Sequence, residues 1–454
     1  MPDFDVIVIG GGPGGYAAAL KAAELGATVA LVEAEKPGGA CVHYTCIPTN
    51  ILLGAAIAHV EGRELGVMGV FSVGDDFNFA RAVARKDALV RQMSDSIAAA
   101  LRMRKVTVIS GRAAFSGAHS VEVTSADVRS VLSAESVIIA TGTRWDAPTL
   151  PGVAPERVYT ADAVQSLAVA PRSALVLGGG AADTAFALEY ATLLAAAGTN
   201  VTFAAPNEKL VPALDTALSA VAEAALTDLG ITLLREASVV NADATTVTVE
   251  HAGGTVQVPA ETVVAVDVRR PFFEALNLAA AGVVTTTLIP VDRRCQTNVP
   301  GVFAVGDVTG GAMLSSAATH MGEVAGANAA GGEAVARLSA LPHVLHTVPE
   351  IGWIGRTEGQ ARAEGYDVCS GVVDLSYGAK ALALGARQGL VKVVAERELG
   401  EVLGVHVVGP GASEMLAVAA SVMQTETTIH DLASMVFWHP SMAEGLAEAA
   451  RRAR

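Results

Sequence analysis

The sequence predicts an α/β protein built from two doubly wound parallel sheets, and two observations lead to this fold class. The first is an internal repeat, because one pattern of strand, glycine turn, helix and strand begins at Asp5 and again at Ser173. The second is size, because 454 residues, 51% of them hydrophobic, exceed a typical domain several times over. We therefore expect two Rossmann-like nucleotide-binding domains and a further C-terminal domain, about three domains in all.

The first copy of the repeat has the signature of a dinucleotide site. An apolar strand from Asp5 leads to Gly10, Gly12 and Gly15, and after an alanine-rich helix the second strand ends at Glu33. Gly10 suits a tight turn, Gly12 lets the backbone approach a pyrophosphate, and Gly15 lets helix and strand pack closely. Glu33 is placed to accept hydrogen bonds from ribose hydroxyls. A glycine turn without a nucleotide is the alternative interpretation.

The second copy keeps the fold pattern but changes the residues that would meet a dinucleotide. Asp183 stands where the first copy has Gly15, and Ala205 ends the second strand where the first copy has Glu33. At about 5 Å and an effective dielectric of about 20, a carboxylate repels another negative charge by about 3 kcal/mol. It would also occupy the anion site at the helix start. We expect this half to be a scaffold without a dinucleotide.

Composition and charge exclude several classes of function. The net charge of −15 argues against a nucleic-acid or anionic-membrane partner, because either requires a basic face. The apolar runs are interrupted before the ~20 residues that a bilayer requires. The N-terminus is acidic where a signal peptide is basic. We expect a soluble, cytoplasmic protein with no membrane partner.

The four cysteines limit the redox chemistry, since Cys295 and Cys369 stand alone whereas Cys41 and Cys46 are five positions apart. A secreted disulfide scaffold of this length would contain more cysteines. Two cysteines with His43 between them do not complete a structural zinc site, so no metal is expected. An ideal helix would hold the two Cα atoms about 8–9 Å apart, beyond the ~7 Å reach of a disulfide. A bond between them would therefore require a distorted helix start.

A family resemblance begins directly after Glu33, with the segment Pro37-Gly-Gly-Ala-Cys41-Val-His-Tyr-Thr-Cys46-Ile-Pro-Thr-Asn50. With the glycine turn, it resembles the FAD-dependent pyridine nucleotide–disulfide oxidoreductases, a family that includes lipoamide dehydrogenase, mercuric reductase and glutathione or mycothione reductase. The resemblance covers essentially the whole chain. Further matching segments are Ala140-Thr141-Gly142, residues 297–308, Val348-Pro349-Glu350, residues 404–410 and residues 438–444.

The resemblance implies FAD as the cofactor and a set of residues that contact it. In the family, the segment that matches Ala140-Thr141-Gly142 forms the second FAD contact, and the aspartate that matches Asp307 holds the ribityl hydroxyls. The implied contact residues are Gly10, Gly12, Pro13, Gly14, Gly15, Glu33, Gly39, Ala113, Ala140, Thr141, Gly142, Gly306, Asp307, Met313 and Leu314.

The resemblance also implies a thiol mechanism. Cys41 would be the interchange thiol that attacks the substrate, and Cys46 the thiolate in charge-transfer contact with the flavin. A position near a helix N-terminus would lower the pKa of both thiols; two inert buried cysteines are the alternative. His439 is the candidate base, oriented by Glu444, because histidine moves protons near neutral pH. In the family this segment reaches the other subunit's disulfide, which implies a homodimer with active sites completed in trans.

The departures from the family gather on the nicotinamide side of the flavin. Asn50 stands where the family usually has a lysine, and Ala185 where it has the glutamate that pairs with that lysine. Losing both leaves no unpaired buried charge. Ala181-Ala182 replaces the bulky pair that often covers the nicotinamide pocket, and Val-Arg-Arg-Pro-Phe at 268–272 replaces Gly-Arg-x-Pro-Asn. With the changes in the second repeat, these replacements make NAD(P) a doubtful cofactor.

Our first hypothesis is therefore an FAD-dependent thiol/disulfide oxidoreductase that does not use NAD(P)H in the usual way. Its substrate would be a small thiol or disulfide or a carrier-bound sulfur group, and its electron partner oxygen, a quinone or another carrier. Another thiol-based reaction at Cys41, such as desulfurisation, also fits. The first alternative is an NAD(P)H-dependent disulfide reductase such as lipoamide dehydrogenase. The second is a non-enzymatic FAD-binding interaction protein.

The motifs also predict domain boundaries. Residues 1–148 would form the first part of the FAD-binding domain and residues 149–268 the degenerate NAD(P)-binding-like domain. Residues 269–338 would complete the FAD-binding domain. Residues 339–454 would form an α+β dimerisation domain.

Overall fold

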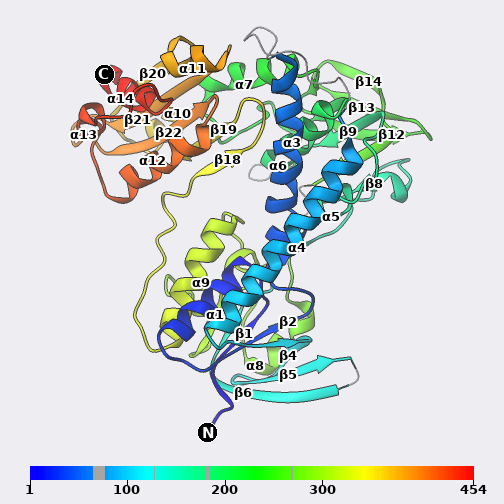
Figure 1. Ribbon diagram of the computed structural model, residues 1–454, viewed down its shortest axis with the longest axis vertical. Helices are drawn as coiled ribbons and strands as arrows, with labels where there is room; N and C mark the ends of the chain where they lie inside the picture. Colours follow the sequence, from blue (N-terminus) through cyan, green and yellow to red (C-terminus); the bar gives the residue numbers. More distant parts are fainter. Residues whose placement is uncertain (65–76, 127, 180–183, 267–268, 454) are drawn as a thin grey trace. The chain divides into compact units, whose positions relative to one another are not determined.

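A computed structural model describes residues 1–453 of the chain except 65–76, 127, 180–183 and 267–268, and the chain folds as two compact units (Figure 1). Unit 1 consists of Met1–Thr49, Val83–Asp146 and Arg269–Leu338. Unit 2 consists of Asn50–Ala82, Ala147–Val268 and Ser339–Arg454. Each copy of the repeat lies in its own unit, so the predicted α/β class with two Rossmann-like sheets is confirmed.

The sheet of unit 1 is parallel where the first repeat forms it. Its strands follow the order β3-β2-β1-β6-β5-β4, and β17 also pairs with β6. Strands β1, β2, β3, β17 and the second half of β6 run parallel, whereas β4, β5 and the first half of β6 are antiparallel. The strands are β1 (Phe4–Ile9), β2 (Val29–Glu33), β3 (Thr107–Ser110), β4 (Arg112–Gly117), β5 (Ser120–Ser125), β6 (Val128–Ile139) and β17 (Val302–Ala304).

Two long helices of unit 1 pack so closely that glycine is required where they meet. Helices α1 (Pro13–Glu24) and α9 (Ser315–Ala329) lie side by side (Figure 1). A Cβ atom on Gly322 would lie 2.2 Å from the Gly14 carbonyl oxygen, and one on Gly326 would lie 2.4 Å from the Ala18 carbonyl oxygen. The backbones of α1 and α9 are therefore in direct contact at these two glycines.

The remaining elements of unit 1 are short, apart from two helices that contribute residues to both units. Those two are α3 (Cys46–Glu64) and α4 (Phe79–Met103). The short elements are α2 (Gly39–His43), β7 (Thr143–Trp145), β16 (Arg269–Pro271), η3 (Glu274–Leu276), α8 (Leu278–Ala281) and η4 (Gly306–Thr309).

The second repeat forms a parallel sheet in unit 2 with the order β11-β10-β9-β15-β8. A three-stranded antiparallel sheet, β12-β13-β14, belongs to the same unit. Asp183, Ala181 and Ala182 lie outside the described residues. The elements are η2 (Pro155–Arg157), β8 (Val158–Tyr159), α5 (Ala161–Val164), β9 (Ser173–Leu177), α6 (Thr184–Ala196), β10 (Asn200–Ala204), α7 (Thr216–Asp228), β11 (Thr232–Leu234), β12 (Ser238–Ala242), β13 (Thr246–His251), β14 (Gly254–Pro259) and β15 (Thr262–Ala265).

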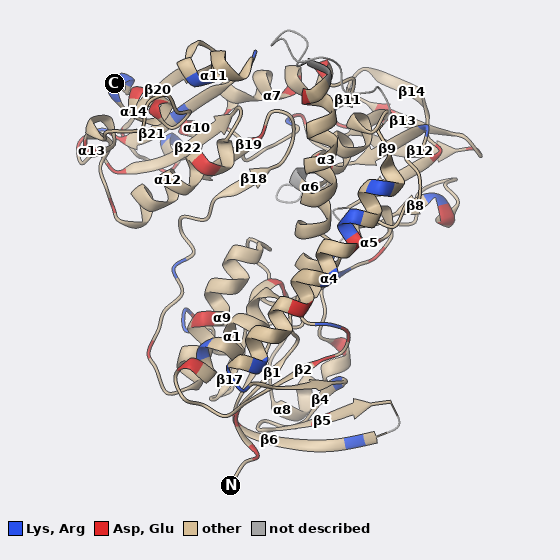
Figure 2. Ribbon diagram, in the orientation of Figure 1, with Lys and Arg blue, Asp and Glu red and all other residues tan. Residues whose placement is uncertain are grey.

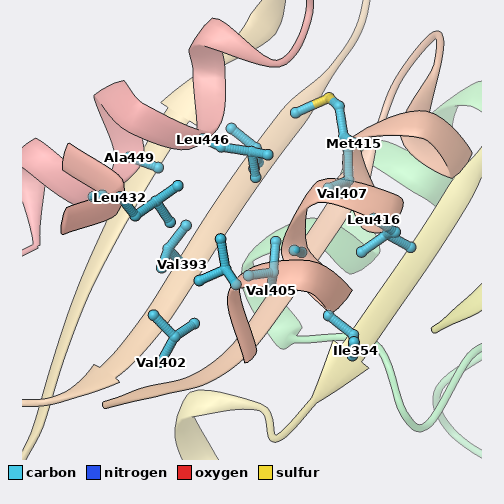
Figure 3. Packing of buried hydrophobic residues seen from close by; sticks show 14 of the residues in the cluster. Ile354, Val393, Val402, Val405, Val407, Met415, Leu416, Leu432, Leu446 and Ala449 are labelled. Carbon is cyan, nitrogen blue, oxygen red and sulfur yellow. The ribbon is translucent and has the colours of Figure 1, made fainter. Parts of the chain in front are cut away.

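The C-terminal part of unit 2 is an antiparallel sheet, β18-β19-β22-β21-β20, covered by helices. Val393 and Val405 of the sheet face Met415 and Leu446 of the helices in one buried cluster (Figure 3). This is the predicted α+β domain. Its elements are β18 (His343–Leu345), β19 (Ile351–Gly355), α10 (Glu358–Ala363), β20 (Val368–Asp374), η5 (Leu375–Tyr377), α11 (Ala379–Leu384), β21 (Leu390–Glu396), β22 (Val402–Val408), α12 (Ala412–Gln424), α13 (Ile429–Ser434) and α14 (Glu444–Arg452).

A buried charge network joins α7 to this antiparallel sheet. Lys392 of β21, whose side chain is 7% exposed, places Nζ 2.9 Å from Asp215 Oδ1 and 2.8 Å from Glu358 Oε2. Asp215 also caps α7 through the Ala217 N–H group. The hydrogen bond from Lys392, followed by that from Arg362, lowers the pKa of Glu358 to about 2. The network therefore holds charged carboxylates at neutral pH.

One helical stretch among the described residues, Gly39–Gly62, is long and apolar enough to cross a membrane, with a mean hydropathy of 1.4. A single such stretch is weak support for a membrane span, because a core helix can have the same length and composition. This one begins beside the glycine turn and carries both clustered cysteines. Charged side chains of both signs are spread over the two units (Figure 2).

Candidate redox active site

The glycine turn of the first repeat forms a cradle that side chains would fill. A Cβ atom on Gly15 would lie 1.8 Å from the Gly10 carbonyl oxygen, and one on Gly10 would lie 2.4 Å from the Ala140 carbonyl oxygen. Gly12 caps α1 without a side-chain hydrogen bond. The first-turn N–H groups of α1 are therefore left to bind an anion, as a pyrophosphate site requires.

Another predicted FAD segment, the one that contains Gly39, lies against the same turn. A Cβ atom on Gly39 would lie 2.5 Å from Gly12 Cα, and the Gly38 N–H group donates to the Gly11 carbonyl oxygen at 2.8 Å. Gly14 packs against Ala318 of α9. All the predicted FAD residues lie in unit 1, with Ala113 on β4, Ala140, Thr141 and Gly142 after β6, Gly306 and Asp307 in η4, and Met313 and Leu314 before α9.

The acid at the end of β2 is fixed against the turn, and the second repeat has nothing in its place. Glu33 accepts hydrogen bonds from the Gly11 N–H group at 2.5 Å and from the Glu35 N–H group at 2.7 Å. In the second repeat, Ala205 is fully buried, and its backbone pairs with Leu234 and Ala237. The residues of the first repeat thus fit a dinucleotide such as FAD, and the end of β10 offers no matching acceptor side chain.

Asp307 contacts an arginine that the sequence analysis did not treat as a site residue. Its Oδ2 lies 3.4 Å from Arg269 Nη1 and 3.4 Å from Thr143 Oγ1. Arg269, whose side chain is 10% exposed, also donates to the Met313 carbonyl oxygen. The pairing of β16 with β7 brings Arg269 to this position. Arg269 therefore balances the charge of the carboxylate predicted to hold the ribityl chain.

The two clustered cysteines lie on separate helices. Helix α2 ends at His43, Tyr44 leaves the helical conformation with φ −131°, and α3 begins at Cys46. This interruption is the distortion that a bond between the cysteines would require. The structure holds both as free thiols. Cys46 Sγ lies 3.3 Å from Ser315 Oγ and 3.7 Å from Thr45 Oγ1. Sequence reasoning did not identify Ser315.

The two thiols differ in their affinity for a proton. A hydrogen bond from Cys41, supported by Ser315 and Thr45, lowers the pKa of Cys46 to about 6. The hydrogen bond to Cys46, together with burial, raises the pKa of Cys41. The prediction of two lowered pKa values is therefore wrong for Cys41, because it keeps the proton that stabilises the charge on Cys46. At neutral pH the reduced pair is a thiol and a thiolate.

The predicted acid–base pair lies in unit 2. Its two members are in contact, with His439 Nδ1 3.0 Å from Glu444 Oε1, and the Ser441 N–H group donates to Glu444 Oε2 at 2.9 Å. The Ser441 hydrogen bond, followed by that of His439, lowers the pKa of Glu444. The His439 side chain is 70% exposed, and Trp438 and Val436 beside it are also exposed.

Four other histidines of the chain have local partners. His343 stacks on Trp353 with the ring centroids 5.2 Å apart, and His346 Nδ1 lies 3.2 Å from Glu350 Oε1. His43 Nε2 lies 3.1 Å from the Pro37 carbonyl oxygen, and His320 Nε2 accepts the Arg337 N–H group. These contacts are consistent with packing roles for the four rings.

A dinucleotide cradle beside a thiol–thiolate pair defines a flavin-dependent disulfide oxidoreductase. The chain belongs to the pyridine nucleotide-disulphide oxidoreductase family, whose sequence profile matches residues 4–322. The dimerisation domain of the same family matches residues 341–450. Membership supports FAD as the cofactor and confirms an enzyme class that acts on dithiols and disulfides.

Proteins similar to this chain include dihydrolipoyl dehydrogenases. That of Thermus scotoductus is 36% identical, with 99% of this chain and 97% of the relative covered. That of Halobacterium salinarum is 33% identical, with 99% and 96% covered. Among solved structures, the Cu(II) complex of the HOCl-induced flavoprotein disulfide reductase RclA from Escherichia coli has a TM-score of 0.86 and 25% identity, with 99% of both chains covered.

Gly15→Ala is expected to lower both FAD content and stability, because its Cβ atom would overlap the Gly10 carbonyl oxygen. Overpacking of this kind costs about 1–3 kcal/mol or more. The flavin-to-protein absorbance ratio and the melting temperature would report the change. Gly54→Ala on α3 is the control, because its Cβ atom meets nothing within 4 Å. A Gly15→Ala protein with full flavin content would contradict the assignment of this turn.

Proposed function

We propose that the protein is an FAD-dependent thiol/disulfide oxidoreductase that oxidises a dithiol at the Cys41–Cys46 pair and does not use NAD(P)H in the usual way. The observation that carries this proposal is the contrast between the two repeats. Glu33 is fixed beside the first glycine turn, whereas Ala205 at the matching position of the second repeat is buried and apolar. The first repeat therefore has the residues that a dinucleotide requires, whereas the second repeat lacks an acceptor side chain for the ribose hydroxyls.

The two cysteines have different roles in the proposed reaction. In the oxidised enzyme, a substrate thiolate attacks Cys41 Sγ, the Cys41–Cys46 bond breaks, and Cys46 leaves as a thiolate. Cys46 is the better leaving group because its pKa is the lower of the two. The second substrate thiolate then attacks the substrate sulfur bound to Cys41. This step forms the substrate disulfide and releases Cys41 as a thiolate. The Cys41 thiolate then takes up a proton.

Protons and electrons balance across these steps. The dithiol loses two protons and two electrons; Cys41 keeps one proton, and His439 takes the other. FAD, when bound, would supply a two-electron acceptor for the reduced cysteines and a route for the electron pair to oxygen, a quinone or another carrier. Glu444 holds Nδ1 of His439, so that Nε2 is free to receive the proton.

In a homodimer, His439 of one subunit could serve as the base for the cysteine pair of the other. The chain carries the family's dimerisation domain, and the exposed His439 side chain lies in that domain. We propose that His439 and Glu444 of each subunit serve the cysteine pair of the other. The substrate would be a small thiol or disulfide, or a sulfur group on a carrier.

The relatives favour a second candidate, an NAD(P)H-dependent disulfide reductase. Several relatives that cover nearly the whole chain bear the name dihydrolipoyl dehydrogenase. Under this alternative, nicotinamide would bind despite Ala205 and Asn50, and electrons would run from the nucleotide to the disulfide.

Anaerobic mixing of the holoenzyme with NADH, NADPH and then a small dithiol separates the two candidates. We expect the flavin's visible absorbance to stay unchanged with either nucleotide and to bleach with the dithiol. Cys369→Ser, which changes a buried cysteine on β20, is the matched control and should bleach like the parent. Rapid bleaching by micromolar nucleotide would overturn the proposal in favour of the second candidate.

A further inference from the structure

The environment of Cys46 raises the question of what stabilises its negative charge. The side chain that follows it by one helical turn on α3 is Asn50, a neutral residue. The side-chain interactions that lower the pKa of Cys46 come from neutral donors, namely the Cys41 thiol, the Ser315 hydroxyl and the Thr45 hydroxyl. The charge on this thiolate is therefore held by hydrogen bonds from uncharged groups.

Of the two hydroxyls, that of Ser315 is the better placed to give its proton to the Cys46 sulfur. Thr45 Oγ1 lies 3.2 Å from the Ala40 carbonyl oxygen, to which it donates, and 3.7 Å from Cys46 Sγ. A hydroxyl has a single proton to donate, so the bond to Ala40 competes with any bond to the thiolate. Ser315 Oγ is closer to the Cys46 sulfur, at 3.3 Å, and its hydroxyl also interacts with the Cys41 thiol, whose pKa it lowers.

The position of Ser315 is set by backbone packing. Ser315 is the first residue of α9, a helix of 15 residues whose axis is fixed against α1 through Gly322 and Gly326. Ser316, the next residue, is exposed. A donor on such a rigid element needs little ordering when charge develops on the sulfur.

We propose that Ser315 is a positioning residue that holds Cys46 as the flavin-side thiolate by donating an O–H···S⁻ hydrogen bond. This inference rests on the proposed function, in which Cys46 is the thiol next to the flavin. It assigns to a neutral hydroxyl from α9 a task that is independent of any contact with substrate.

Other titratable groups face the pair, and their effects differ from that of Ser315. Burial, and to a lesser extent the two cysteines, raise the pKa of Tyr16 on α1, so its side chain is neutral near pH 7. Asp307 of η4 acts mainly on Cys41, whose pKa it helps to raise, and is itself paired with Arg269. Cys41 supplies the other strong hydrogen bond to Cys46.

The test uses the Cys41→Ser holoenzyme, in which Cys46 is the only cysteine of the pair and a hydroxyl remains at position 41. The pKa of Cys46 is measured in two ways, from the pH dependence of the charge-transfer absorbance and from that of Cys46 alkylation by iodoacetamide, mapped by mass spectrometry. Adding Ser315→Ala is expected to raise this pKa by about one to two units, because a hydrogen bond to a charged group is lost.

Two variants make the result specific. Ser315→Thr keeps the hydroxyl and is expected to restore the parent pKa, whereas Ser316→Ala changes a neighbouring exposed serine and is expected to leave it unchanged. Ser315→Gly removes the same hydroxyl and replaces Ser315→Ala if that variant fails to fold. An alkylation profile that Ser315→Ala does not shift would overturn the inference.

The two readouts also separate this inference from the proposed function. If the Cys41→Ser parent shows no charge-transfer band at any pH, the flavin-side role of Cys46 is wrong, and the inference falls with it. If the band is present and Ser315→Ala leaves its pKa unchanged, only the role of Ser315 is wrong.

Discussion

Cys41→Ser is expected to abolish dithiol oxidation, with a loss of at least about a thousandfold in kcat, as for removal of other catalytic nucleophiles. The serine hydroxyl cannot form the mixed disulfide through which electrons leave the substrate. Cys46 remains able to hold its charge, because serine still offers a hydrogen bond in place of the Cys41 thiol. Steady-state oxidation of a small dithiol, with flavin content measured on the same sample, checks the result.

Cys295→Ser provides a second comparison for this experiment. Cys295 is buried, and burial, followed by the charge of Asp292, raises its pKa to about 12, so it is unreactive at neutral pH. It should therefore keep the activity of the parent. A Cys41→Ser enzyme that retains a substantial share of its turnover would move the interchange step to another group.

Lys392→Met is expected to lower the free energy of unfolding by about 3–5 kcal/mol, because it leaves the buried Asp215 carboxylate without this cation and removes one of the two cationic partners of the half-buried Glu358. Asp215 and Glu358 both lie within 2.9 Å of the ammonium group. Urea unfolding followed by circular dichroism would measure the loss. Lys21→Met is the control, since its ion pair with Glu24 at 3.4 Å is exposed and such pairs contribute about 0–1 kcal/mol.

The same network sets an acid limit on stability. The pKa of Glu358 falls from 4.5 to about 2 in the folded chain. A carboxyl group with a depressed pKa stabilises the fold above its ordinary pKa, and this contribution is lost as the pH falls toward the folded value. Stability should therefore decline between about pH 4.5 and pH 2 in the parent. In Lys392→Met this decline should be shallower, and an unchanged acid profile would show that the lysine does not hold the network.

The sequence was most informative where a motif is local. The turn from Gly10 to Gly15 and the acid at Glu33 follow from spacing alone, because one strand–turn–helix unit encodes them. The parallel arrangement of β1 and β2 follows from their continuous apolar runs, since strands with both faces covered do not alternate. The class of the site could be predicted for the same reason.

The sequence was least informative where two distant segments meet. Ser315 and Cys46 are 269 positions apart, and nothing in the serine's surroundings indicates a sulfur partner. Lys392 lies within an apolar strand and would be expected to face solvent, yet it is buried because Asp215 from another segment neutralises it. The unequal pKa values of the cysteines likewise depend on tertiary hydrogen bonds, which helix position alone does not reveal.

Helix α9 has a consequence for the protein before it acquires its cofactor. The same helix contacts Gly14, in the turn expected to bind the phosphates of FAD, through Gly322, and it reaches Cys46 through its first residue, Ser315. If this turn became disordered in the absence of the cofactor, α9 would be held less firmly, and the hydrogen bond from Ser315 to the Cys46 thiolate would weaken as well. Newly made chains that have not yet bound flavin should thus be more vulnerable to thiol-oxidising stress than the mature enzyme. Binding of FAD would then protect Cys46 from oxidation.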